Sequence, residues 1–223
     1  KTVAILTPTF NKDKFDLICT PAHDQNKFNN SDNVIFFEGS LAKVSLDETD
    51  ENIVLVAIGG RSKHYYFDEE SILNQIEYFL SLYPNKEYYV FNSKRTPKSM
   101  NNKLIKLAKI KEIIFCDYKN NDTSFESILH KASAKLITRD SVNMIFESLS
   151  CKGNTYLVDM KIKNKMNKVV RTINNLIEQK KIGHIDQSDM VDGLSATKIY
   201  KQNVYNDVFA EVEKVAYKLN QLI

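Results

Sequence analysis

The sequence predicts an α/β protein built around a mostly parallel sheet. From about Asn52 onward, short apolar runs rich in β-branched residues alternate with segments of helical periodicity. This alternation is typical of βαβ units, in which a helix connects each strand to the next parallel strand. The runs are short and mostly apolar, as strands covered on both faces require.

The first fifty residues differ from the rest of the chain. They contain three strand candidates, at residues 3–6, 16–19 and 34–37, separated by polar loops that hold no complete helical repeat. We therefore expect residues 1–50 to be a remnant or the C-terminal part of one α/β domain. Residues 51–223 form the second domain, which is Rossmann-like and ends in a helix.

The second domain has five expected strands, and helix signals follow them. Asp68 precedes the first apolar stripe and Pro84 closes it, while Thr96 followed by Pro97 predicts an N-cap with proline at the first helical position. The strands are expected at residues 53–58, 88–92, 112–117, 134–138 and 155–159.

The later helices also have recognisable boundaries. Thr123 and Glu126 fit a capping box, and a further helix begins near Asp140 and is broken by Gly153. Two more helices are expected at residues 165–180 and 204–222. Their core-facing residues are Met166, Val169, Val170, Ile173 and Ile177 in the former and Val208, Val212, Val215 and Leu219 in the latter.

The composition argues against several classes of protein. The 31 basic and 28 acidic residues are dispersed, unlike the clustered basic face of a nucleic-acid-binding protein. No apolar run is long enough for a membrane span. Cys19, Cys116 and Cys151 are odd in number and far apart, which favours neither disulfides nor zinc and fits a reducing cytoplasm.

The turns after the strands are the expected ligand site, because parallel sheets bind ligands at the carboxyl ends of their strands. Three of the four arginines of the chain lie in these turns, although lysine is its usual cation. Arginine binds phosphate and carboxylate in a bidentate manner, so this placement favours an oxyanion such as pyrophosphate. The candidate residues are Gly59, Gly60, Arg61, Ser62, Ser93, Arg95, Thr96, Arg139, Asp140 and Ser141.

Each of these residues also has an ordinary structural interpretation. The arginines would then pair with nearby carboxylates, for example Arg139 with Asp140 or Arg61 with Asp68. The glycines would form a simple turn. Glu147, nearly two helical turns beyond Ser141, would face either solvent or a ribose diol.

His23 and Asp24 form a second candidate site, because they also follow a strand. If the two domains face each other, this pair lies across the cleft from the arginines. A histidine beside a carboxylate can act as a general base, and it can equally be part of a capped turn. The spacing of the histidines favours no metal site.

Several of these segments together resemble a known family. Residues 58–65 (IGGRSKHY), 93–97 (SKRTP) and 138–144 (TRDSVNM) with Glu147 resemble the mitochondrial fission "elongated mitochondria" family, as do residues 15–24 and 33–39. That family joins a plant fission protein to bacterial proteins described as glycosyltransferases of lipopolysaccharide core assembly. The resemblance covers nearly the whole chain.

The resemblance implies a GT-B-like pair of Rossmann-like domains, with a nucleotide-sugar donor bound mainly by the C-terminal one. It implies that Gly59, Gly60 and Ser141 hold the diphosphate and that Glu147 reaches the ribose. His23 and Asp24 would then face the sugar and the acceptor. The donor is a substrate, and the resemblance implies no metal and no separate cofactor.

Two functions follow as expectations. The first is a cytoplasmic glycosyltransferase that transfers a sugar to a lipid-linked or saccharide acceptor at the inner membrane face, with at most peripheral membrane contact. The alternative is a non-catalytic adaptor that binds a protein partner at a membrane surface. RNA binding ranks last because no aromatic stacking motif is present. In GT-B-like folds the terminal helix can cross to the other domain, although such helices more often pack into their own core.

Overall fold

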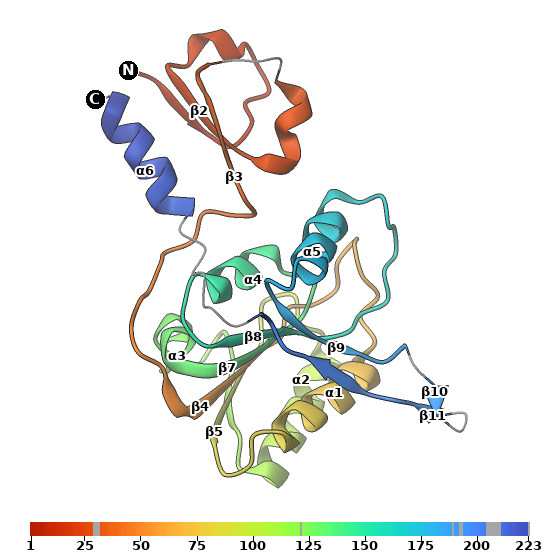
Figure 1. Ribbon diagram of the computed structural model, residues 1–223. Helices are drawn as coiled ribbons and strands as arrows, with labels where there is room; N and C mark the ends of the chain where they lie inside the picture. Colours follow the sequence, from red (N-terminus) through yellow and green to blue (C-terminus); the bar gives the residue numbers. More distant parts are fainter. Residues whose placement is uncertain (29–31, 121, 189, 192–193, 204–210, 223) are drawn as a thin grey trace.

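The computed structural model describes residues 1–28, 32–120, 122–188, 190–191, 194–203 and 211–222. These residues form a seven-stranded sheet, a three-stranded sheet and a two-stranded pairing, and Figure 1 shows the three-stranded sheet above the seven-stranded one. The chain is α/β throughout, and the sheet of the larger unit is parallel except at one edge. The predicted Rossmann-like α/β fold is confirmed.

Seven strands form the large sheet, in the order β12-β9-β8-β7-β4-β5-β6. All neighbours pair in parallel except β12, which runs antiparallel to β9. The strands are β4 (Asp50–Ala57), β5 (Glu87–Phe91), β6 (Ile114–Cys116), β7 (Ala132–Ile137), β8 (Asn154–Leu157), β9 (Gly183–Asp186) and β12 (Lys198–Tyr200).

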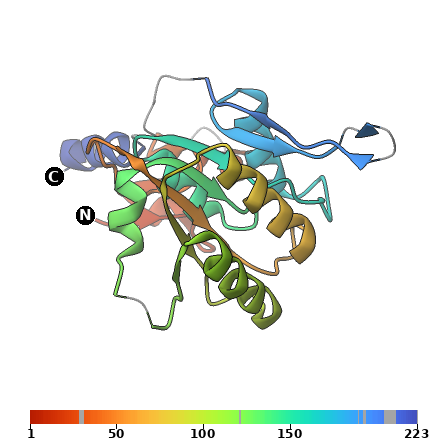
Figure 2. The same cartoon turned by 90° about the horizontal axis from the view of Figure 1, so that it is seen from below.

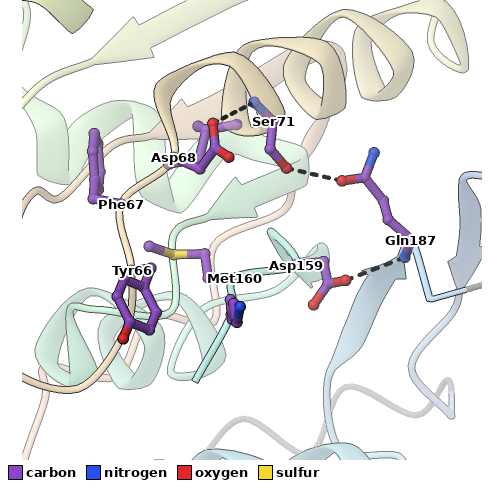
Figure 3. Close-up of a pocket in the computed structure, with 9 residues that line it drawn as sticks. Tyr66, Phe67, Asp68, Ser71, Asp159, Met160 and Gln187 are labelled. Atoms are coloured by element: carbon purple, nitrogen blue, oxygen red, sulfur yellow. Dashed lines mark hydrogen bonds between the residues drawn. The ribbon is translucent and has the colours of Figure 1, made fainter. Parts of the chain in front are cut away.

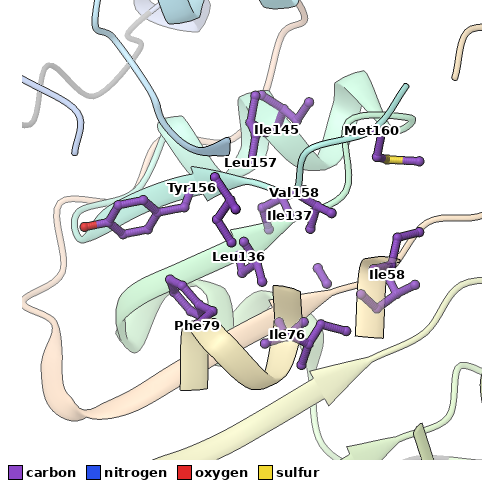
Figure 4. Packing of buried hydrophobic residues seen from close by; sticks show 14 of the residues in the cluster. Ile58, Ile76, Phe79, Leu136, Ile137, Ile145, Tyr156, Leu157, Val158 and Met160 are labelled. Carbon is purple, nitrogen blue, oxygen red and sulfur yellow. The ribbon is translucent and has the colours of Figure 1, made fainter. Parts of the chain in front are cut away.

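Helices cover both faces of this sheet, as Figure 2 shows from below. Because successive side chains of a strand point to opposite faces, Val54 and Val56 of β4 join one hydrophobic cluster while Ile53 and Leu55 join another. Figure 4 shows Ile145 on one side of the strands and α1 on the other. The helices are α1 (Glu69–Ser81), α2 (Lys98–Lys111), α3 (Phe125–Lys131), α4 (Val142–Leu149) and α5 (Lys168–Glu178).

The small sheet comprises three parallel strands, β1 (Val3–Ile5), β2 (Leu17–Pro21) and β3 (Val34–Phe37). Two 3₁₀ helices, η1 (Lys12–Lys14) and η2 (Ala22–Lys27), lie in its loops. The last helix, α6 (Glu211–Leu222), packs on this sheet rather than on the large one. Val215 is its buried contact, and the Glu38 N–H donates to the Glu211 carboxylate at 2.9 Å.

Some predicted helix boundaries and core positions are wrong. Pro97 rather than Thr96 is the N-cap of α2. The Thr96 hydroxyl is not available as a cap because it donates to the Gly59 carbonyl, in the turn after β4. Ser124, and not Thr123, caps α3 by accepting from the Ser127 N–H. Met166 is 75% exposed because α5 begins only at Lys168.

Other boundaries agree with the prediction or lie outside the described residues. Asp68 caps α1 as expected, accepting from the Ser71 N–H at 3.1 Å. Residues 204–210, which include the expected start of the last helix and Val208, lie outside the described residues. Glu112 ends α2 in the left-handed conformation, so β6 starts at Ile114 and not at residue 112.

The prediction missed the strands after α5. The edge strand β12 has only three residues and pairs in the antiparallel sense with β9, and a two-stranded pairing of β10 (Met190–Val191) and β11 (Leu194–Ser195) follows β9 in the chain. These segments are short and lack the apolar runs of the central strands, because edge strands need less covering.

Candidate functional site

The strand order places β4 at a reversal of the sheet topology. Strands β5 and β6 follow on one side of β4, whereas β7, β8 and β9 lie on the other. Such a reversal leaves a crevice at the carboxyl ends of the two central strands, where open α/β sheets bind ligands. The turns after β4 and β7 meet there, because the Gly59 N–H donates to the Thr138 hydroxyl oxygen at 2.8 Å.

The Gly59–Gly60 turn is held by contacts within the protein. The Gly60 N–H donates to Asp140 Oδ2 at 2.9 Å, so both glycine N–H groups have internal acceptors. A Cβ atom on Gly59 would lie 2.3 Å from the Asp140 carboxylate, and one on Gly60 would lie 2.0 Å from the Arg95 carbonyl oxygen. Glycine is therefore required at both positions for close packing of the turns.

The hydroxyls of the turn after β5 serve the same purpose. The Ser93 hydroxyl donates to the Gly59 carbonyl at 2.9 Å, and the Thr96 hydroxyl donates to that carbonyl as well. The Ser93 N–H in turn donates to the Thr96 oxygen at 2.9 Å. These two predicted ligand-binding residues thus join the turns after β4 and β5.

Asp140 connects all three turns. Its side chain is fully buried, and its Oδ2 atom lies 2.9 Å from Nη2 of Arg95, whose side chain is 45% exposed. The pairing of Arg139 with Asp140 that the sequence suggested is not present. Instead, Arg139 Nη2 lies 3.3 Å from the Asp159 carboxylate and donates to the Ile185 carbonyl at 3.5 Å.

Four buried polar atoms near these turns have no hydrogen-bond partner among the described residues. They are His64 Nδ1, Tyr65 Oη, Arg139 Nε and Asp140 Oδ1. Tyr65 lies within electrostatic range of Arg139 and Asp140, and His64 within range of Asp140 and Arg95. Because buried polar groups normally find partners, this cluster is where we expect ordered water or the polar part of a ligand.

Burial also changes the proton affinity of this cluster. It raises the pKa of Tyr65 to about 12, so the hydroxyl keeps its proton and can donate. It lowers the pKa of the Arg139 guanidinium, an effect that the Asp159 carboxylate opposes. Burial, followed by the charge of Lys63, lowers the pKa of His64. His64 therefore favours the neutral form at neutral pH.

A pocket of about 390 Å³ opens beside these turns at the carboxyl ends of β4 and β5. Phe91 and Phe125 form an edge-to-face pair in its wall, with ring centroids 5.2 Å apart. Burial raises the pKa of Glu147, and the charge of Glu126 adds to that effect. The residues that line the pocket are Ala57, Phe91, Asn92, Tyr118, Phe125, Met144 and Glu147.

The sequence analysis found Glu147 but missed the rest of this pocket. The polar residues directly after two strands, Asn92 after β5 and Asp117 after β6, could have indicated this pocket in the sequence. Asn92 donates to Asp117 at 3.0 Å and accepts from the Tyr118 N–H at 2.7 Å, which orients the loop that carries Tyr118.

The remaining candidates of these turns have different surroundings. Arg61 is exposed, and Ser62 Oγ accepts from the N–H groups of His64 and Tyr65, both at 3.2 Å. Ser141 is the N-cap of α4, but its side chain caps no helix N–H. The first turn of α4 therefore still offers backbone donors at this edge of the sheet.

A second pocket, of about 530 Å³, includes Asp159, the ion-pair partner of Arg139, in its lining (Figure 3). Asp159 borders this pocket and also accepts from the Gln187 N–H at 3.2 Å, while the Ser71 hydroxyl donates to Gln187 Oε1 at 2.9 Å. The polar walls of this pocket are thus already bonded to one another.

His23 and Asp24 lie in η2 and approach α5. Asp24 Oδ1 is 2.6 Å from Lys168 Nζ and 2.9 Å from Lys27 Nζ, and Oδ2 accepts from the Thr7 hydroxyl at 2.7 Å. Burial raises the pKa of Asp24, but these bonds outweigh it and hold the pKa well below its ordinary range. Asp24 is therefore an ion-pair partner and a poor proton acceptor.

His23 borders a polar pocket of about 450 Å³ against α5, where Arg171 and Asn175 are among its neighbours. Burial lowers the pKa of His23, while Asp24 opposes this shift. Asp24 and His64 both lie near the start of α5, through Lys168 and Asn167 respectively. The pocket that His23 borders, by contrast, extends along this helix as far as Glu178.

The described residues contain no group of three or more histidine, cysteine, aspartate and glutamate side chains that could hold a metal ion. The three cysteines are buried and unpaired. Within the part of the chain that the structure describes, no helix has the length and apolar character needed to cross a bilayer.

Comparison with protein families gives a match. The family model described as mitochondrial fission ELM1 matches residues 1–222, which is nearly the entire chain. No curated protein matches the sequence.

Proposed function

The chain belongs to the mitochondrial fission ELM1 family, and from this premise we propose that it binds a nucleotide-sugar and transfers the sugar to a lipid-linked or saccharide acceptor. The observation that carries the proposal is the Glu147 pocket at the topological reversal, near the buried polar atoms that have no partner among the described residues. An apolar pocket with a few converging polar groups is the usual form of a small-molecule site.

Each part of the donor has a matching group in this proposal. Tyr118 and Phe91 offer apolar surface to the base, and the Glu147 carboxylate accepts hydrogen bonds from the ribose hydroxyls. The diphosphate lies at the start of α4, where unpaired N–H groups and the helix dipole favour negative charge. Gly59 and Gly60 shape this site and do not donate to it, because their N–H groups are engaged elsewhere.

In the reaction, the acceptor oxygen forms a bond to the anomeric carbon while the bond from that carbon to the diphosphate oxygen breaks. The bonding electrons leave with the diphosphate, which the start of α4 stabilises. His23 takes the acceptor proton, because its lowered pKa keeps it neutral and able to accept. Asp24 positions η2 against α5 through Lys168.

The experiment is a thermal-shift titration with UDP, GDP, ADP and CMP and their sugar conjugates. A ligand at about 100 times its Kd should stabilise the fold by about 2.7 kcal/mol. Glu147→Gln should abolish most of the shift for the ligand that binds, whereas Glu213→Gln, on the exposed face of α6, should leave it unchanged. An equal thermal shift in both variants would show that Glu147 does not contact the nucleotide.

The adaptor function has one observation in its favour. Most hydrogen-bonding groups of the turns that would bind the donor already have partners within the protein, namely the Ser93 and Thr96 hydroxyls and both glycine N–H groups. Turns whose hydrogen bonds are made internally are stable without a ligand, as a non-catalytic adaptor requires. Absence of a shift with every nucleotide, in protein shown to be folded, would favour the adaptor.

A further inference from the structure

Two loops of the large unit together carry six cations and no carboxylate. We name residues 61–66 and 161–168 the basic loop pair. Their cations are Arg61, Lys63, Lys161, Lys163, Lys165 and Lys168. The neighbouring carboxylates, Asp68 and Asp159, lie outside both segments. Residues 94–111, which include α2, also hold seven cations and no carboxylate, so the basic loop pair is one of two such concentrations of positive charge.

The structure holds the two loops side by side. Tyr65 and Ile162 form an antiparallel bridge, the Tyr66 N–H donates to the Lys161 carbonyl at 2.9 Å, and the Lys163 N–H donates to the His64 carbonyl at 2.9 Å. Lys163 Nζ also donates to the Ser62 carbonyl at 2.7 Å. The cations of both loops are therefore displayed on one fixed piece of backbone.

Most of these cations form no close ion pair, although the charge of Arg61 adds to the hydrogen bond from Ser99 in lowering the pKa of Glu69. Lys168 pairs with Asp24, but the other five form no ion pair with any residue that the structure describes. Arg61, Lys63, Lys161, Lys163 and Lys165 are all exposed. Their positive charge is thus available to an anionic partner.

Two large apolar side chains project among these cations. Met166 is 75% exposed and Tyr66 is 52% exposed. The ammonium groups of Lys161 and Lys163 lie over the Tyr66 ring, 5.7 and 5.3 Å from its centroid. The two ammonium groups lie where a nucleic-acid base would stack on the Tyr66 ring, so stacking is disfavoured. An exposed methionine among lysines instead suits the interface of a bilayer, where its apolar side chain can enter between the headgroups.

We propose that the basic loop pair binds the surface of a membrane that contains anionic lipids, with Met166 and Tyr66 entering the headgroup region. Cations near such a surface are attracted by its negative potential, within about one Debye length. The same loops contain His64 and Tyr65, so this contact places the unpartnered cluster close to the bilayer. The membrane contact does not depend on whether the protein transfers a sugar.

The test is co-sedimentation of the whole chain with vesicles of phosphatidylcholine alone and of phosphatidylcholine with 30 mol% phosphatidylglycerol, a composition chosen at about the anionic content of a cytoplasmic leaflet. We expect binding to the anionic vesicles only, and loss of that binding in high salt. The triple variant Lys63→Gln, Lys161→Gln, Lys165→Gln should bind roughly a hundredfold more weakly, at about fivefold for each lysine.

The matched control is Lys106→Gln, Lys109→Gln, Lys111→Gln, which removes the same charge from the exposed face of α2. It should retain nearly all binding. Met166→Ser should weaken binding without changing its salt dependence. Equal losses in the two triple variants, or no binding of wild-type protein to anionic vesicles, would overturn the proposal. Tighter binding to a single-stranded oligonucleotide than to vesicles, through the same lysines, would replace the membrane with nucleic acid.

Discussion

Arg95 and Asp140 form an ion pair in which a single carboxylate oxygen, Oδ2, is 2.9 Å from the guanidinium and also accepts the Gly60 N–H at 2.9 Å. The other oxygen, Oδ1, is buried and has no partner among the described residues. Asp140 therefore organises the three turns on one side and faces the unpartnered cluster on the other.

The contact of Asp140 with Gly59 can be tested by a double-mutant cycle. Gly59→Ala should lower the free energy of unfolding by about 1–3 kcal/mol, because its Cβ would overlap the carboxylate. Asp140→Ala alone should also destabilise the protein, since Gly60 and Arg95 lose their acceptor. The double variant should lose less than the sum of the two, as measured by urea unfolding. Strict additivity would contradict the predicted overlap.

Tyr65→Phe should leave the stability of the ligand-free protein within about 1 kcal/mol of wild type, because the buried hydroxyl has no hydrogen-bond partner among the described residues. Tyr156→Phe is the matched control, since its hydroxyl accepts from Tyr83 at 3.3 Å. Urea unfolding measures both. A loss above about 2 kcal/mol in Tyr65→Phe would mean that an ordered water or another group satisfies the hydroxyl.

Lys135 should make the stability depend on pH. It is fully buried, and Nζ donates to the carbonyls of Ser148, Cys151 and Lys152 at the end of α4. Burial lowers its pKa from 10.5 to about 8. Between these two values the unfolded chain binds the proton that the folded protein releases, so the contribution of Lys135 to stability rises with pH, by about 3 kcal/mol at most.

This contribution is measured as the difference between wild type and Lys135→Met in urea unfolding at several pH values from 7 to 10. The comparison cancels the titration of the tyrosines, Cys19 and Cys116. Burial raises the pKa of Cys151 and the charge of Lys135 opposes that shift, so the pKa of Cys151 itself changes with the substitution. Parallel curves for the two proteins would show that Lys135 keeps an ordinary pKa.

Val215→Ala should destabilise the small unit by about 1–2 kcal/mol, because Val215 is the buried contact of α6 with Leu17, Cys19, Ile35 and Phe37. Tyr217→Ala, at a site 64% exposed, should have little effect. Hydrogen exchange of β2 and β3 reports the change locally. Exchange that increases only in the large sheet would contradict this packing.

If His23 is the base of the proposed transfer, kcat/KM should fall at acid pH as His23 becomes protonated. Its pKa is lowered, so this limb should lie below the ordinary histidine value of about 6.5. His23→Gln should reduce kcat/KM by about 100-fold or more and remove the limb. His64→Gln is the comparison variant, and retention of the limb only in His64→Gln would support the role of His23.

Much of the fold follows from local patterns in the sequence. The apolar runs near residues 53–58, 88–92 and 134–138 predict three central strands within a few residues, because a strand covered on both faces must be apolar throughout. Strand β9 and the edge strand β12 are short and lack that signal, so their pairing with the sheet was not predicted. The N-caps at Thr96 and Thr123 were wrong because tertiary contacts and a neighbouring serine compete for the same role.

The sequence by itself determined the α/β class, the order of the strands from β4 to β8 and the turns in which the arginines lie, since these depend on spacing along the chain. Only the tertiary structure decided which ion-pair and hydrogen-bond partners the residues of those turns have. It paired Arg139 with Asp159, engaged the glycine N–H groups internally, and packed α6 on the small sheet. Hydrogen bonds between turns depend on distances in space, and residues 59, 95 and 140 come together only when the parallel strands align.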